Sequence, residues 1–342
     1  MNFETGRTTE DSPRLADPPR IRDSRGILDS PRIPDSRSIP DSLRWGVGLA
    51  FATALISGFS IFVNGFAVKQ VPDAAVYTTL KNAIAALLLV GIATATVRRS
   101  DVAAMDGRSW LRLTAIAIVG GSVPFLLFFT GLAQASAPSA AFIQKTLFIW
   151  VAILAVPFLG ERLGFAQLGA LAVLLGGQFL VIRPSGVTWG SGETMIAAAT
   201  LLWAVESIMA KRLLASVPSQ IVGAGRLGIG LVVLIGFLVV TGRVESIAAL
   251  TFTQWAWVLG TGVILSAYVA TWFAALRRAP ASLVTAILVV GAPITAVLQA
   301  IQAGAFPGPI ILAGEVLITM AAILLAIQAM RRPAHRDQPA MG

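Results

Sequence analysis

Residues 44–68 read RWGVGLAFATALISGFSIFVNGFAV, a run of 25 residues in which Arg44, at the start, is the one charged side chain. A helix needs about 20 mostly apolar residues to cross about 30 Å of hydrocarbon. This stretch is long enough, and nine further stretches of the same kind follow it along the chain. We therefore predict ten membrane-spanning helices, at about 44–68, 73–97, 110–133, 138–160, 164–183, 190–213, 219–241, 254–276, 281–303 and 308–330.

The composition of the whole chain supports this prediction. The 342 residues are 56% hydrophobic and 13% charged, and the mean hydropathy is +0.79. Such a chain cannot present an ordinary water-facing surface, so most of it must be solvated by lipid or by its own helices. The predicted fold class is an all-α integral membrane protein. The chain contains no cysteine, which excludes disulfides and thiolate metal sites.

Short motifs recur in the two halves of the chain. Trp45-Gly46-Val47-Gly48 opens the first span, and Trp189-Gly190-Ser191-Gly192 opens the sixth. Pro72 and Pro218 precede spans two and seven, and two Ala-Pro turns precede spans four and nine; members of each pair are 142 to 146 residues apart. We predict two five-helix repeats, at 44–184 and 189–331. Because five is odd, the second repeat enters the membrane inverted, an arrangement typical of secondary transporters.

The segments outside the spans predict the orientation. The tail at 1–43 repeats Asp-Ser-Pro-Arg and Pro-Asp-Ser units and has few apolar side chains, so we predict that it is disordered. If both this tail and the one at 332–342 are cytoplasmic, the opposite side holds three basic residues, Lys69, Arg183 and Arg243. The cytoplasmic connections then hold twelve: Arg98, Arg99, Arg108, Arg112, Arg162, Lys211, Arg212, Arg277, Arg278, Arg331, Arg332 and Arg336.

This excess of basic residues favours cytoplasmic tails. We expect a bacterial inner membrane as the location. The formal net charge of +9 follows from the same excess and does not indicate nucleic-acid binding.

The end of span four reads Val151-Ala-Ile-Leu-Ala-Val-Pro157-Phe-Leu-Gly160-Glu161-Arg162-Leu163. Its Gly-Glu-Arg-Leu motif, together with the duplicated ten-span plan, resembles the EamA-like branch of the drug/metabolite transporter superfamily. The resemblance covers about 44–331 and implies a carrier or exporter of small metabolites. The second half carries no Glu-Arg pair near 303–306, so we assign no substrate role to the motif.

Five charged residues fall inside predicted spans: Lys81, Lys145, Glu206, Arg226 and Glu315. A charge at the bilayer centre costs about 2.5–3.5 kcal/mol on insertion scales, so such residues face a cavity or a partner. Lys81 and Arg226 lie nine and eight residues after the matching prolines, in corresponding helices of the halves. Three basic groups against two acids favour an anionic group on the substrate, such as a carboxylate or a phosphate.

The predicted substrate-binding residues are Lys81, Lys145, Arg226, Glu206, Asn82 and Gln144. The basic groups could instead pair with the interior acids or with helix-end carbonyls, and Lys81 could reach the outer interface. Glu206 could be a counter-ion or a protonatable coupling group. Asn64 and Gln178 could line the cavity or join helices. We expect a small-molecule substrate, no cofactor, no metal and no catalytic residue.

Two other classes are weighed against a carrier. An enzyme acting on lipid needs a nucleophile or a general acid and base. No predicted span carries histidine or cysteine, and the one histidine, His335, lies in the carboxyl-terminal tail. A lipid flippase would instead direct its basic residues into a groove open to lipid. The pattern Gly223-Ala224-Gly225-Arg226-Leu227-Gly228 satisfies a dinucleotide-binding motif but lies inside a span, so we interpret its glycines as helix contacts.

Overall fold

The computed structural model describes Met1 and residues 41–331, except 72, 133, 136 and 183–188. The described residues contain helices and no strand. The first half comprises α1 (Asp41–Gln70), α2 (Ala74–Thr96), α3 (Arg99–Ala103), α4 (Gly107–Gly121), α5 (Val123–Leu132), α6 (Ala137–Lys145), α7 (Leu147–Leu159) and α8 (Phe165–Ile182). The second half comprises α9 (Ser191–Leu213), α10 (Ser219–Val240), α11 (Glu245–Ala248), α12 (Phe252–Arg278), α13 (Ala281–Leu288), α14 (Gly291–Ala303) and α15 (Pro309–Arg331).

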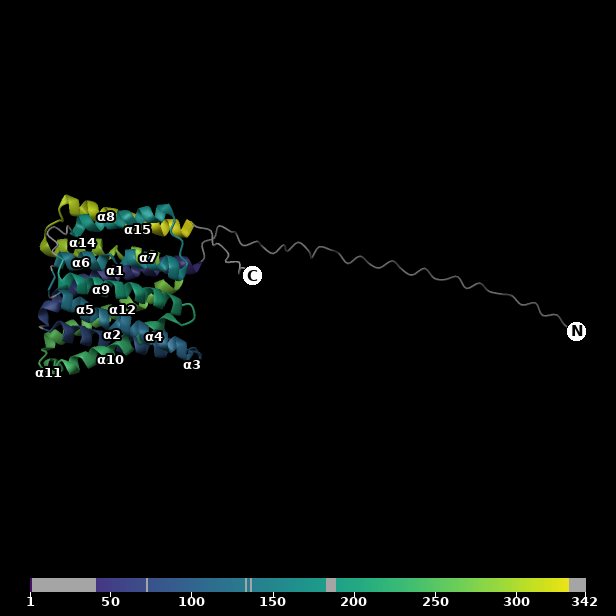
Figure 1. The fold of residues 1–342 in the computed structure, drawn as a ribbon, viewed down its shortest axis with the longest axis horizontal. Coiled ribbons are helices and arrows are strands. Elements are labelled where there is room, and N and C mark those ends of the chain that lie inside the picture. Colours follow the sequence, from purple (N-terminus) through teal and green to yellow (C-terminus); the bar gives the residue numbers. More distant parts are fainter. Residues whose placement is uncertain (2–40, 72, 133, 136, 183–188, 332–342) are drawn as a thin grey trace. The chain divides into compact units, whose positions relative to one another are not determined.

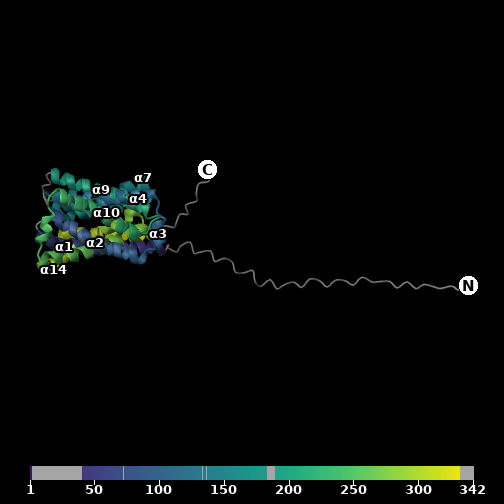
Figure 2. The ribbon, with the colours of Figure 1, turned by 90° about the horizontal axis from the view of Figure 1, so that it is seen from below.

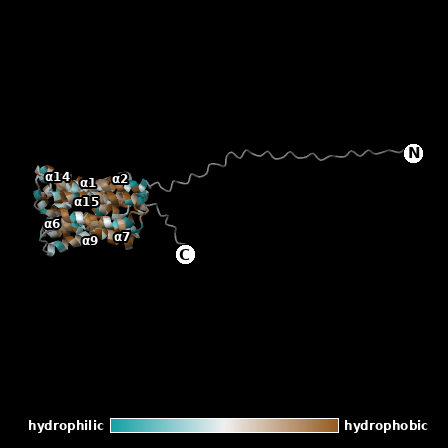
Figure 3. Ribbon diagram, turned by 90° about the horizontal axis from the view of Figure 1, so that it is seen from above, coloured by the Kyte–Doolittle hydropathy of each residue, from teal (hydrophilic) through white to brown (hydrophobic). Residues whose placement is uncertain are grey.

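These helices form ten spans, as predicted. Within the described residues, nine helices or pairs of consecutive helices are long and apolar enough to cross a membrane, and α8 is a tenth, shorter apolar helix. Figures 1 and 2 show the long helices running side by side in one bundle, with α3 and α11 at opposite ends. Hydrophobic residues extend along the bundle and hydrophilic ones gather toward its ends (Figure 3). The protein is therefore an integral membrane protein.

The boundaries differ from the prediction by a few residues. The first helix begins at Asp41 and so includes three residues assigned to the disordered tail. Residues 2–40 of that tail, and the tail at 332–342, lie outside the described residues.

Three spans are broken near their middle. The breaks fall at Ser122 between α4 and α5, at Thr146 between α6 and α7, and at 289–290 between α13 and α14. Pro124 and Pro293 lie in the first turn after a break, whereas α7 continues through Pro157. Backbone carbonyls near two breaks accept side-chain hydrogen bonds: Ser122 Oγ donates to Ala117 O at 3.2 Å, and Thr146 Oγ1 to Ile143 O at 2.6 Å. Such local bonds let a span break inside a bilayer.

The contacts between helices follow a twofold symmetry that exchanges the two halves. α1 packs against α12 as α9 packs against α4 and α5, and α2 packs against α12 as α10 packs against α4. The pairs α2–α10 and α8–α15 map onto themselves under the exchange. These contacts join one half to the other, so each half covers the buried faces of its counterpart. The fold is two inverted five-helix repeats, as the spacing of the motifs predicted.

Glycines permit the closest of these contacts, as between α8 and α15. A Cβ on Gly177 would lie 2.8 Å from Gly314 O and 2.8 Å from Ile318 Cγ1. The neighbouring Gly176 is exposed and has no such neighbour within 4 Å. Small residues allow membrane helices to associate without a hydrophobic driving force.

We expect Gly177→Val to destabilise the protein by about 1–3 kcal/mol, because the added atoms must push α8 and α15 apart. The measurement is the thermal-unfolding midpoint of the purified protein in detergent. Gly176→Val is the matched control, with the same change in helix propensity but open space around the side chain, and its midpoint should stay near that of the wild type. Equal midpoints for the two variants would contradict this account of the interface.

Candidate functional site

A cavity of about 210 Å³ lies between helices of both halves. Its walls come from α1, α5, α6 and α7 in the first half, and from α9, α10, α12 and α13 in the second. Most lining residues lie well inside their spans and not at their ends. Inverted-repeat transporters hold their substrate at such a depth, between the two halves. Its polar lining residues are Ser57, Ser60, Gln144, Lys145, Glu206, Ser207, Arg226, Tyr268 and Thr285.

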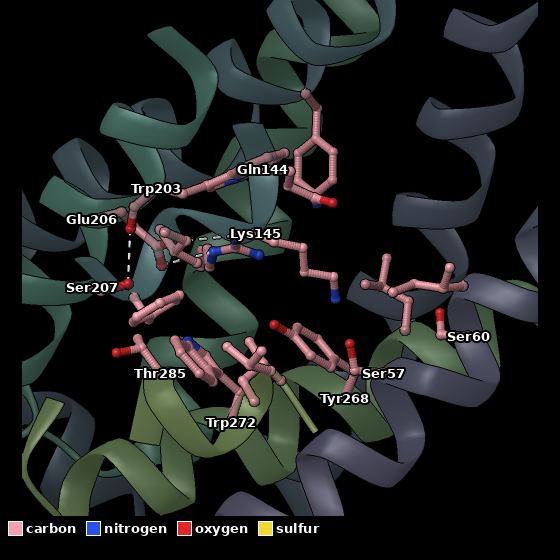
Figure 4. Close-up of a pocket in the computed structure, with 18 residues that line it drawn as sticks. Ser57, Ser60, Gln144, Lys145, Trp203, Glu206, Ser207, Tyr268, Trp272 and Thr285 are labelled. Carbon is pink, nitrogen blue, oxygen red and sulfur yellow. Dashed lines mark hydrogen bonds and ion pairs between the residues drawn. The ribbon is translucent and has the colours of Figure 1, made fainter. Parts of the chain in front are cut away.

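Lys145 is the last residue of α6, immediately before the break at Thr146. Figure 4 shows its side chain extending into the cavity between Gln144 on one side and Tyr268 and Ser57 on the other. Among the described residues, no carboxylate forms a salt bridge with its ammonium group. An ammonium group in a low-dielectric interior is costly unless something compensates its charge. The cavity therefore presents a cation that can receive an anionic ligand.

Arg226 and Glu206 form a buried ion pair in the cavity wall. Arg226 Nε lies 2.9 Å from Glu206 Oε1, and the two side chains are 9% and 3% exposed. Arg226 Nη2 donates to Gly120 O at 2.9 Å and to Glu206 Oε2 at 3.4 Å. The guanidinium also lies 5.9 Å from the ring centre of Phe125. Glu206 is thus the counter-ion of Arg226, one of the two roles that the sequence left open.

The ion pair changes the charge available to a ligand. The described lining holds two basic groups and one acid, and Arg226 and Glu206 neutralise each other. One net positive charge remains, on Lys145. The sequence had suggested three basic groups around the substrate.

Lys81 and Asn82 lie outside this cavity lining. Lys81 is buried on α2, where its Nζ donates to Asn64 Oδ1 at 3.1 Å and lies 5.0 Å from the ring centre of Tyr77. Tyr77 Oη donates to the same Asn64 oxygen at 2.7 Å. Asn82 is fully buried, and its amide makes no hydrogen bond with a described residue. Lys81 thus has polar and aromatic neighbours on α1 and α2.

Lys81 and Arg226 are nevertheless related by the twofold exchange. A Cβ added to Gly262 on α12 would lie 3.1 Å from Lys81 O, and one added to Gly121 on α4 would lie 2.3 Å from Arg226 O. Equivalent glycines therefore pack on the backbones of both basic residues. Sequence reasoning placed the two residues in corresponding positions correctly. It could not predict that the cavity would reach only one of them.

Two other interior polar residues lie away from the cavity. Glu315 on α15 is buried with Oε1 unbonded, and the Gln178 amide on α8 is buried without a hydrogen bond to a described residue. The contact between Gly177 and Gly314 brings these two helices together. Glu315 and Gln178 therefore belong to the edge formed by α8 and α15, seen in Figure 1.

Sequence reasoning missed the aromatic wall of the cavity. Five large rings line it: Phe125, Phe148, Trp203, Tyr268 and Trp272. Tyr268 and Trp272 stack with centroids 6.2 Å apart, and Phe125 meets Trp203 edge to face at 5.5 Å. Tryptophan and tyrosine in membrane proteins concentrate at the interfaces. Their position deep within α9 and α12 is a signal that could have identified this wall.

The Gly-Glu-Arg-Leu motif joins the two halves at one end of the bundle. Gly160 ends α7 with φ of 68°, a left-handed conformation that favours glycine. The Glu161 carboxylate then accepts hydrogen bonds from the backbone N–H groups of Ala281 at 2.6 Å and Ser282 at 3.2 Å, and from the Ser282 hydroxyl. A carboxylate at a helix N-terminus is stabilised by the helix dipole. Glu161 thus holds the start of α13, in the other half.

Two basic residues of α9 reinforce the same end. Lys211 Nζ donates to Leu276 O at 2.5 Å and to Ala279 O at 2.8 Å, at the end of α12. Arg212 Nε donates to Phe158 O at 3.0 Å, at the end of α7. With Glu161, these bonds tie α7, α9, α12 and α13 together on one side of the cavity. We refer to Glu161, Lys211, Arg212 and Ser282 as the end cluster.

A bundle of ten spans in two inverted halves, with a polar cavity between them, is typical of membrane transporters. The profile of the EamA-like transporter family matches residues 44–183 and 190–327. The chain belongs to this family, which is part of the drug/metabolite transporter superfamily. No curated protein is significantly similar to the chain in sequence. One crystal structure is 17% identical, aligns with a TM-score of 0.70, and covers 86% of this chain and 99% of its own. That likeness concerns the fold alone.

Proposed function

We propose that this protein is a secondary carrier for a small metabolite that bears one anionic group. The observation that carries the proposal is the Lys145 ammonium, which extends into the central cavity and forms no salt bridge with a described carboxylate. A carboxylate or a phosphate oxygen supplies the charge and the acceptor that this group lacks. Organic acids, amino acids and phosphorylated metabolites all carry such a group.

The other lining residues support a small substrate with an apolar portion. A volume of about 210 Å³ suits a metabolite better than a lipid. The wall opposite Lys145 includes Tyr268, and Trp203 and Trp272 supply further aromatic surface. Binding sites for small molecules combine such surface with few polar groups. Ser57, Ser60 and Gln144 offer hydrogen bonds for the remaining polar atoms of the substrate.

Alternating access supplies the transport step. The end cluster closes one side of the cavity, and the bonds of Glu161 and Arg212 run between elements of different halves. Lys145 lies next to a helix break, where backbone angles can change with little rearrangement of neighbouring turns. Rocking of one half against the other would break the bonds of Glu161 and Arg212 and open that side of the cavity. A carrier of this kind needs no catalytic residue.

A flippase is the less favoured alternative. It predicts basic residues directed into a groove open to lipid. Lys145 and Arg226 instead line the cavity between the halves. We therefore favour a carrier of water-soluble metabolites.

The function is tested by uptake into proteoliposomes that contain the purified full-length protein. Radiolabelled amino acids, organic acids and phosphorylated metabolites are screened against protein-free vesicles. We expect saturable uptake of at least one anionic solute, inhibited by other anions of similar size and not by matched cations. Transport confined to cationic or uncharged solutes would refute the proposal.

We further propose that both tails are cytoplasmic in a bacterial inner membrane, so that the end cluster faces the cytoplasm. The support is the distribution of basic residues among the connections. Reporter fusions after residue 342 and within 242–252, between α10 and α12, should report opposite sides, with the carboxyl-terminal fusion in the cytoplasm. Three spans separate the two fusion sites, so the same side for both fusions would contradict the assignment.

A further inference from the structure

A second hollow, of about 480 Å³, lies between α2, α3, α4 and α10. None of its lining residues lines the central cavity. Its walls include Val90, Val102 and Trp110, which are 43%, 40% and 42% exposed. The hollow is therefore an apolar groove on the outer, lipid-facing surface, at the end of the bundle where α3 lies (Figure 1). We call it the α10 groove.

Two glycines of α10 shape this groove. A Cβ on Gly225 would lie 2.5 Å from Leu113 Cδ2, so this glycine lets α4 approach. Gly228 also lines the groove, but a Cβ there would have no atom of a neighbouring element within 4 Å. Packing requires glycine at 225 and leaves unfilled space at 228. Arg226 belongs to the same helix but lines the central cavity, so α10 separates the two sites.

The depth of the groove matches one leaflet of a bilayer. Gly228 lies nine residues after Ser219, the first residue of α10, which is about 14 Å along the helix axis. Half of the hydrocarbon thickness of a bilayer is about 15 Å. A lipid acyl chain that starts at the membrane surface would therefore reach Gly228 and end near it.

The surface end of the groove carries a positive charge. Arg99 lines the groove, and Arg98, Arg108 and Arg112 are exposed on the same turn and helix start. None of these four arginines forms a salt bridge with a carboxylate among the described residues. The acids of this segment are Asp101 and Asp106, and Asp106 Oδ1 accepts the Ser109 N–H at 2.9 Å as a helix cap. The four arginines exceed the two acids by two positive charges.

We propose that the α10 groove binds an anionic phospholipid, with one acyl chain against Gly228 and the phosphate beside Arg99. Clusters of basic residues next to the membrane attract anionic headgroups. A tryptophan such as Trp110 is typical of the headgroup region. The groove supplies the apolar contact that a charged surface alone lacks. This site is independent of the proposed substrate.

Native mass spectrometry of the delipidated full-length protein tests the site. The probes are phosphatidylglycerol and phosphatidylcholine with identical acyl chains, titrated separately. We expect phosphatidylglycerol to bind about tenfold more tightly. Arg99→Gln should weaken phosphatidylglycerol about fivefold, as expected for one basic residue at a membrane surface, and leave phosphatidylcholine unchanged. Gly228→Leu should fill the groove and reduce the binding of both lipids.

Two matched variants serve as controls. Gly236→Leu places the same side chain on α10, at an exposed glycine outside the groove with no neighbour within 4 Å. Arg277→Gln removes an exposed arginine at the end of α12. Both should bind the two lipids like the wild type. Equal binding of the two lipids by the wild type, or unchanged binding by a normally folded Gly228→Leu variant, would overturn the proposal. Occupancy of the groove by a protein helix that displaces lipid would also overturn the proposal.

Discussion

Lys145→Gln should reduce the affinity for an anionic substrate by about 10- to 150-fold. The substitution removes a charged hydrogen-bond donor, and bonds to charged groups contribute about 1.5–3 kcal/mol. Each 1.4 kcal/mol corresponds to a factor of ten in the dissociation constant. The expected result is a raised KM for uptake into proteoliposomes, measured with the anionic solute that the wild type transports best. Lys145→Arg keeps the charge and should retain part of the affinity.

Lys69→Gln is the matched control for this prediction. It makes the same chemical change at the end of α1, where the side chain is exposed and outside the cavity lining. Its KM should equal that of the wild type. Lys81→Gln provides a second comparison with Lys145→Gln. It also removes a buried lysine, but one whose ammonium group donates a hydrogen bond to Asn64. Unchanged KM in a normally folded Lys145→Gln protein would show that this lysine has no substrate role.

Arg226→Gln should destabilise the protein by about 3–5 kcal/mol. The substitution leaves the Glu206 carboxylate buried without its cation, and breaking a buried ion pair on one side carries this cost. The carboxylate could take up a proton, which would reduce the loss. We therefore expect Glu206→Gln combined with Arg226→Gln to be more stable than Arg226→Gln alone. Unfolding midpoints in detergent, taken for both single variants and the double variant, measure this coupling.

The surface pair of Arg243 and Asp73 is the control for this cycle. Arg243 Nη1 lies 3.4 Å from Asp73 Oδ2, and the side chains are 44% and 27% exposed. Exposed pairs contribute about 0–1 kcal/mol, because water and salt screen them. Arg243→Gln should therefore leave the midpoint nearly unchanged. Equal effects of the Arg226 and Arg243 variants would show that burial does not strengthen the interior pair.

The class of fold could be predicted from the sequence because two features, the length of the apolar stretches and the spacing of repeated residues, can be read directly from it. Span length reflects hydrocarbon thickness, so stretches such as 44–68 could be recognised without knowledge of any contact. The spacing of Trp45 and Trp189, and of Pro72 and Pro218, indicated a duplication. An odd number of helices in each half then determined the inversion.

Sequence reasoning assigned three charged residues of the cavity to the interior on energetic grounds. Lys145, Glu206 and Arg226 are charged and lie within spans, and such residues face the interior because hydrocarbon does not solvate charge. The same reasoning selected Lys81 and Glu315. It could not distinguish among them, because burial against a neighbouring helix satisfies the energetic requirement as well as a cavity does.

The sequence by itself determined ten spans, their duplication and the presence of interior charge. Tertiary structure alone decided which charges meet. Glu206 on α9 comes within 2.9 Å of Arg226 on α10 because both helices pack against α4. Lys81 on α2 meets Asn64 on α1 because both helices pack against α12. Hydropathy depends on one residue at a time. Pairing depends on distances between residues far apart in the chain. This is why Lys145, the one basic residue of the described cavity lining without a carboxylate partner, emerged only from the fold.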